Sequence, residues 1–218
     1  MPFVNRTEAG IALAAALSRF RDQDPVVLAL PRGGVPVAFE IARALDAPLD
    51  LVVARKIGVP FQPELAMGAV VNGDTPIVVR NDDVIAVTGI DEAQFDAVCR
   101  RETAEIKRRR ERYLGGRAPV DVIGKTVIVV DDGIATGATV RAALRATRTR
   151  APRRLVLAMP VAPNDTLGEL KPEADEIVCL ESHEFFGSIG AYYNDFSQVS
   201  DDEVVALLAA AKPNTDAR

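Results

Sequence analysis

The stretch VIVVDDGIATGAT, residues 127–139, decides the fold of this chain. Its four apolar residues, Val127–Val130, are typical of a short strand that is buried on both faces. Two adjacent carboxylates, Asp131 and Asp132, end the strand, and a loop of small residues then leads into a helical pattern over residues 139–148. Because the carboxyl ends of strands form the ligand crevice of an open α/β sheet, the stretch predicts a binding loop at that edge.

The loop over residues 133–139 has the chemistry of a phosphate site. The start of a helix offers free backbone N–H groups and the positive end of the helix dipole. Thr136 and Thr139 add hydroxyl donors, and Gly137 allows the backbone to approach a ligand closely. The acidic pair would repel a phosphate, so we expect it to bind hydroxyl groups or a cation beside one. A phosphorylated sugar would suit both the loop and the acidic pair. The alternative is that this stretch forms a surface turn with an acidic cap.

A second loop of the same kind is Leu30-Pro31-Arg32-Gly33-Gly34, directly after the apolar run Val26–Leu30. Arg32 presents a planar fork of donors that suits phosphate oxygens, and the two glycines expose backbone N–H groups. Alone, this loop is equally well an ordinary turn between a strand and a helix. Together with the first loop, it would place two anion sites at one edge of the sheet.

Five apolar runs without polar alternation predict strands that are buried on both faces. They are Val26–Leu30, Leu49–Ala54, Val127–Val130, Leu155–Met159 and Ile177–Leu180. Helical patterns lie between them at residues 35–45, 139–148 and 166–170. This βαβ rhythm predicts an α/β fold with a parallel, Rossmann-like sheet and right-handed connections.

Residues 55–125 break the rhythm, and we expect them to be a strand and helix insertion within a single domain, residues 1–218. The core of this domain would lie at about residues 26–54 and 126–180. A small C-terminal hood and a helix would follow at residues 181–211.

Within the insertion, Met67–Val71 and Ile77–Val79 predict a hairpin around the turn Asn72-Gly73-Asp74. A long helix is predicted from about Asp91 to Tyr113, and it would end at Gly115-Gly116. This helix carries a run of four basic residues.

The basic run, Lys107–Arg110, is most simply a solvated helix face, although phosphate steering and an oligomer contact are alternatives. Helices are also expected at residues 8–20 and 200–211, with a frayed tail at 212–218. The aromatic-rich segment 183–196 is expected either to pack under the C-terminal helix or to stack on an acceptor.

Composition excludes several classes of protein. The chain has 218 residues and a formal net charge of −5, which argues against a general nucleic-acid binder. The chain has one histidine and two cysteines, which are too few for a typical zinc site or a disulfide scaffold. No apolar stretch reaches the ~20 residues of a membrane span, and residues 1–6 do not resemble a signal peptide. We therefore expect a cytoplasmic protein.

Taken together, these residues resemble the type I phosphoribosyltransferase family. Residues 127–139 are similar to the family's signature for phosphoribosyl pyrophosphate (PRPP), and Leu30–Gly34 is similar to its pyrophosphate loop, which often contains a non-proline cis peptide. The resemblance spans about Val26–Leu180. It implies a parallel-sheet phosphoribosyltransferase core that carries the insertion and the C-terminal hood.

The resemblance implies a role for each loop position. The 5′-phosphate would be held by Gly133, Ile134, Ala135, Thr136, Gly137, Ala138 and Thr139. Asp131 and Asp132 would contact the ribose hydroxyls. The pyrophosphate would be bound by Arg32, Gly33, Gly34 and Lys56. Mg²⁺ would bind mainly through PRPP, near the two aspartates, rather than through a dedicated protein site.

The implied reaction needs charge stabilisation more than a protein nucleophile. The ribose C1–O bond would break first, and Mg²⁺ with Arg32 would stabilise the departing pyrophosphate. Asp131, Asp132 and Arg32 are therefore the candidate catalytic residues. Ala135 stands where members that use 6-oxopurines commonly carry an aspartate, which weakens a hypoxanthine–guanine assignment.

The predicted function is Mg²⁺-dependent transfer of a 5-phosphoribosyl group from PRPP to an unidentified acceptor, a nitrogenous base. One alternative is a regulator that senses PRPP or a nucleotide with little catalysis. Another is a phosphosugar hydrolase that uses Asp131 or Asp132. The expected partners are PRPP and the acceptor, without nucleic acid or membrane, and a homodimer is common in the family.

Overall fold

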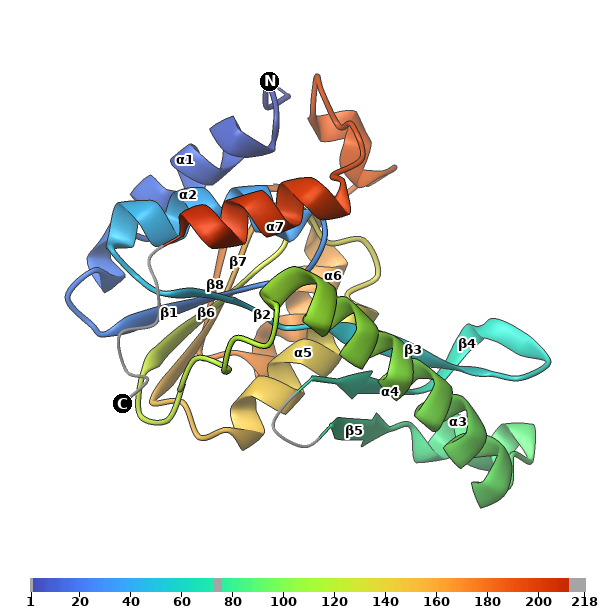
Figure 1. The fold of residues 1–218 in the computed structure, drawn as a ribbon. Helices are drawn as coiled ribbons and strands as arrows, with labels where there is room; N and C mark the ends of the chain where they lie inside the picture. The colour runs from blue at the N-terminus through green and yellow to red at the C-terminus, as the bar shows by residue number, and fades with distance from the viewer. Residues whose placement is uncertain (1, 73–75, 212–218) are drawn as a thin grey trace.

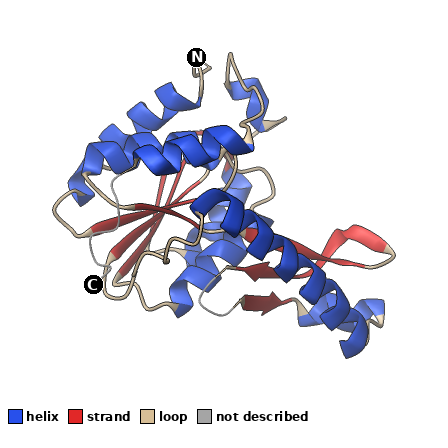
Figure 2. Ribbon diagram, in the orientation of Figure 1, coloured by secondary structure: helices blue, strands red, loops and turns tan. Residues whose placement is uncertain are grey.

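A five-stranded parallel sheet forms the centre of the molecule. The computed structural model describes residues 2–72 and 76–211. The strand order is β2-β1-β6-β7-β8, and every neighbouring pair is parallel. The strands are β1 Pro25–Ala29, β2 Leu49–Leu51, β6 Thr126–Val130, β7 Arg154–Pro163 and β8 Glu176–His183. All five apolar runs therefore contribute strands to one parallel sheet, as predicted (Figure 2).

Two details of the predicted strands are wrong. The run Leu49–Ala54 does not form one strand, because β2 ends at Leu51 and Ala54 already belongs to a different sheet. The run Ile177–Leu180 is only partly buried in the edge strand β8, whereas all three residues of β2, the other edge strand, are buried.

Helices cover both faces of this sheet. Figure 1 shows α1 (Arg6–Ala16), α2 (Gly34–Leu45) and α7 (Asp201–Ala210) together on one side, with α5 (Ala138–Thr149) and α6 (Asn164–Leu170) on the other. Alternate residues of each strand point to opposite faces, so the two layers have separate apolar cores.

Three short 3₁₀ turns are also present: η1 (Ser18–Phe20), η2 (Lys171–Glu173) and η3 (Ile189–Tyr192). The helix predicted over residues 8–20 is thus divided, since α1 ends at Ala16 before η1 begins.

A second, antiparallel sheet is built from the insertion. It consists of β3 (Ala54–Val59), β4 (Gln62–Val71) and β5 (Ile77–Arg80), and the β3–β4 hairpin extends away from the central sheet (Figure 1). The predicted hairpin is confirmed as β4 and β5, although residues 73–75 of its turn lie outside the described residues. The tail at 212–218 lies outside them as well.

The segment that follows β2 and contains Lys56 forms the strand β3. A further helix, α3 (Asp82–Thr88), follows β5 and has no buried residue. The long helix is confirmed as α4 (Glu92–Leu114). A capping box at Asp91 begins it, and Gly115 ends it with a φ of +54°. Among the described helices, none is both long and apolar enough to cross a membrane.

A buried carboxylate ties the end of the insertion to the central sheet. Asp50, in β2, is 2% exposed. Its Oδ1 accepts the N–H of Leu51 at 2.8 Å, and its Oδ2 accepts the N–H of Val120 at 2.8 Å. The Asp50 side chain therefore helps to anchor the chain between α4 and β6 to the central sheet.

We expect Asp50→Asn to lower the free energy of unfolding by about 1–3 kcal/mol, because the amide NH₂ cannot accept a buried N–H. Urea unfolding measures this change. Asp121→Asn is the control, since Asp121 accepts the N–H of Ile123 at an exposed position. Equal effects of the two substitutions would show that Asp50 does not anchor this segment.

Candidate functional site

The two predicted loops meet at the carboxyl ends of β1 and β6, which are neighbours in the sheet. The N–H of Leu30 donates to the carbonyl of Val130 at 2.9 Å. A Cβ added at Gly33 would lie 2.0 Å from Oδ2 of Asp132, and one at Gly34 would lie 2.7 Å from the carbonyl oxygen of Val130. The loops are therefore in direct contact, and both glycines are needed for this approach.

The loop over residues 133–139 is open at its helical end. Gly137, with a φ of +70°, precedes α5 and supplies no capping side chain. Thr136 and Thr139 are exposed beside it. Because the first N–H groups of a helix have no partner within the helix, this end can receive an anion. Ile134 differs from its neighbours: its side chain is buried and its N–H donates to the carbonyl of Val161 at 3.0 Å.

The acidic pair is held in place by residues that are distant in the sequence. Nε of Arg6 donates to Oδ2 of Asp132 at 2.7 Å, and the two side chains are only 11% and 10% exposed. The hydroxyl of Tyr193 donates to the backbone carbonyl of Asp132 at 2.6 Å. Burial and the adjacent Asp132 carboxylate raise the pKa of Asp131 well above its usual range.

The N-terminal segment and the hood form one unit above the acidic pair. The N–H of Phe3 donates to the carbonyl of Tyr192, and the N–H of Asn194 donates to the carbonyl of Phe3, each at 2.8 Å. The guanidinium of Arg6 lies 3.9 Å from the ring centroid of Phe196. The hood aromatics thus cluster with the N-terminal segment, which is a different arrangement from the expected packing under α7.

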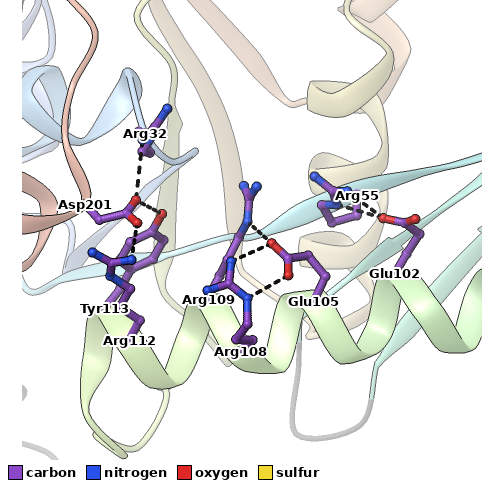
Figure 3. A network of polar contacts seen from close by, with 9 residues as sticks. All are labelled: Arg32, Arg55, Glu102, Glu105, Arg108, Arg109, Arg112, Tyr113 and Asp201. Carbon is purple, nitrogen blue, oxygen red and sulfur yellow. Dashed lines mark hydrogen bonds and ion pairs between the residues drawn. The ribbon is translucent and has the colours of Figure 1, made fainter.

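Arg32 faces a carboxylate from the other end of the chain. The peptide bond between Pro31 and Arg32 is cis. Nη1 of Arg32 lies 3.6 Å from Oδ1 of Asp201, the first residue of α7. Asp201 also accepts the hydroxyl of Tyr113 at 2.7 Å and pairs with Arg112 at 2.8 Å (Figure 3). The end of α4 and the start of α7 therefore reach the second loop.

Lys56 lies in β3, where its Nζ donates to Glu64 Oε2 at 3.0 Å. It lines a cavity of about 560 Å³ between the second sheet and α5, together with Ala138 and Thr139 of the first loop. Arg32 does not line this cavity. The structure therefore associates Lys56 with the end of the first loop rather than with Arg32.

Arg6, Tyr193 and Asp201 were missed by the sequence reasoning. No local pattern marks them, because Arg6 is 126 residues from Asp132 and Tyr193 is 61 residues from it. Within residues 2–72 and 76–211, no group of three or more histidine, cysteine or acidic side chains is placed to hold a metal ion.

A parallel sheet with two contacting ligand loops at the carboxyl ends of adjacent strands is the arrangement that the resemblance predicts for a phosphoribosyltransferase. A family model described as a phosphoribosyl transferase domain matches residues 4–196. The chain belongs to this family.

Similar proteins support the same assignment. A Mycobacterium tuberculosis H37Rv protein, provisionally named a phosphoribosyl transferase, is 48% identical over 209 residues, which are 96% of this chain and 47% of that protein. The crystal structure of TT1426 from Thermus thermophilus is 40% identical, with a TM-score of 0.85, and covers 98% of this chain and 100% of that chain. This chain spans about half the length of the curated relatives it matches.

Proposed function

We propose that this chain binds PRPP and transfers its 5-phosphoribosyl group to a nitrogenous base in a Mg²⁺-dependent reaction, releasing pyrophosphate in the cytoplasm. The observation that carries the proposal is the direct contact between the two loops. At Gly33 the backbone leaves no room for a Cβ beside Asp132, so the anion-binding loop after β1 adjoins the acidic pair after β6. A substrate with a phosphate, a sugar and a pyrophosphate spans this arrangement.

The first loop would bind the 5′-phosphate through the N–H groups of residues 135–139 and the hydroxyls of Thr136 and Thr139. Ile134 would not take part through its N–H, which already donates to Val161. Asp132 would offer Oδ1 to a ribose hydroxyl, because Arg6 occupies Oδ2. Because Arg6 holds Oδ2 and Tyr193 holds the backbone carbonyl, Asp132 has little freedom to lose when the ribose binds.

In the transfer step, the C1–O bond of the ribose breaks and its electron pair leaves with the pyrophosphate. The base nitrogen then forms the new bond to C1, and the proton that this nitrogen carried is released with the pyrophosphate. Arg32 would stabilise the charge that develops on the departing pyrophosphate. Asp131 and Asp132 are hard oxygen donors that suit Mg²⁺ when substrate oxygens complete its coordination. The chemistry that this ion supplies is neutralisation of the pyrophosphate charge.

The experiment is an assay of pyrophosphate release with PRPP, Mg²⁺ and a panel of purine and pyrimidine bases. We expect release that depends on one base and is abolished when EDTA removes Mg²⁺. Because Ala135 supplies no acid–base group, hypoxanthine and guanine are expected to be poor acceptors. Tight PRPP binding without turnover on any base would contradict the proposed transferase activity and favour a PRPP-sensing regulator.

A further inference from the structure

A carboxylate at the start of α7 faces the loop after β1. Oδ1 of Asp201 lies 3.6 Å from Nη1 of Arg32, and among the described residues Asp201 is the one acidic residue that pairs with this arginine. The side chain of Arg32 is 34% exposed and that of Asp201 is 23% exposed. A long, partly exposed arginine side chain has many rotamers, so a fixed partner determines where its fork of donors lies.

Asp201 is itself held by residues outside that loop. Its Oδ1 accepts the hydroxyl of Tyr113 at 2.7 Å, and its Oδ2 pairs with Nη1 of Arg112 at 2.8 Å (Figure 3). Tyr113 is buried in the apolar core, and Ser200 caps α7 by accepting the N–H of Glu203 at 3.1 Å. The carboxylate is therefore fixed both by the start of its own helix and by the end of α4.

The charges around Asp201 leave Arg32 available to an anion. The pKa of Asp201 is lowered by the hydrogen bond from Tyr113 and by the nearby charges of Arg112, Arg32 and Arg109, so its carboxylate is ionised at neutral pH. Arg112 lies closer to this carboxylate than Arg32 does, at 2.8 Å against 3.6 Å. Asp201 thus orients Arg32 while Arg112 balances most of its negative charge.

We propose that Asp201 is a positioning residue, which holds the guanidinium of Arg32 in place for the pyrophosphate that departs in the transfer step. The inference rests on the proposed function and extends it to the ends of α4 and α7. An arginine that is already oriented loses less side-chain freedom when it binds phosphate oxygens. Asp201 contacts Arg32 rather than the ligand, so its effect on pyrophosphate depends on that arginine.

The test compares Asp201→Ala with Asp202→Ala. Both substitutions remove an acidic residue from the first turn of α7 and an ion pair with Arg112, but Asp202 makes no contact with Arg32. We expect Asp201→Ala to weaken binding of inorganic pyrophosphate, measured by calorimetry with Mg²⁺, by about 5- to 20-fold. Asp202→Ala should stay within about twofold of the wild type. Ribose 5-phosphate lacks the pyrophosphate and should bind equally to all three proteins, which a general structural effect would not allow.

A double-mutant cycle tests whether Asp201 acts through Arg32. In a protein that carries Arg32→Gln, we expect Asp201→Ala to change pyrophosphate binding by no more than about twofold. A structural effect, or an electrostatic effect of Asp201 on the ligand itself, would persist in that protein. Thermal unfolding checks that each variant is folded, and if Asp201→Ala does not fold, Asp201→Asn is compared with Asp202→Asn in the same way.

The outcomes separate this inference from the proposed function. Suppose that the wild type binds pyrophosphate and ribose 5-phosphate. If Asp201→Ala then loses no more pyrophosphate affinity than Asp202→Ala, or loses as much when Arg32→Gln is present, the positioning role is wrong and the proposed function stands. Tighter binding by Asp201→Ala would also overturn the positioning role, because the carboxylate would then compete with the anion for Arg32. If the wild type binds neither ligand, the proposed function fails and the inference fails with it.

Discussion

Gly33→Ala is expected to reduce kcat/KM for PRPP by about 100-fold or more while the protein remains folded. The new Cβ would lie 2.0 Å from Oδ2 of Asp132, so either the second loop or the carboxylate must move. A displacement of about 1 Å at a reacting centre costs on the order of 10²-fold in rate. Initial rates of pyrophosphate release measure the loss, and a ribose 5-phosphate titration shows whether binding is lost as well.

The control for this substitution is Gly168→Ala. Gly168 lies in α6, and a Cβ added there meets nothing within 4 Å. Its activity should equal that of the wild type. Should Gly33→Ala retain activity within about threefold of Gly168→Ala, the close contact between the two loops would have no role in the reaction.

Arg6→Met is expected to lower the free energy of unfolding by about 3–5 kcal/mol, because it leaves the carboxylate of Asp132 without its partner in a buried site beside Asp131. Activity should fall with it, since the same carboxylate is proposed to bind the ribose. Chemical denaturation measures the first effect, and the transfer assay under folding conditions measures the second.

Arg148→Met is the matched control. Arg148 forms a two-point ion pair with Asp175 at 2.8 and 2.9 Å, and both side chains are about 40% exposed. An exposed pair contributes about 1 kcal/mol or less. If the two arginine substitutions destabilise the protein equally, burial of the Arg6–Asp132 pair does not determine its contribution.

The central sheet and both ligand loops were predictable because each depends on a local pattern. Unbroken apolar runs indicate buried parallel strands, and each loop combines glycine with a donor or an acidic pair at a strand end. β3 was missed because Lys56, Gly58 and Pro60 are typical of a loop. It forms a strand because it pairs with β4, and only two of its residues, Ile57 and Val59, are buried.

The remaining parts of the site depend on contacts between distant segments. Arg6 reaches Asp132 only because the N-terminal segment pairs with the hood, and Asp201 reaches Arg32 only because α7 lies beside the end of α4. No periodicity encodes such contacts.

The most direct test of the proposed site is a crystal structure of the protein with ribose 5-phosphate and Mg²⁺. The proposal predicts that the phosphate lies against the N–H groups of residues 135–139 and the hydroxyls of Thr136 and Thr139, with a ribose hydroxyl on Oδ1 of Asp132. A phosphate bound elsewhere, or a ribose turned away from the acidic pair, would contradict it.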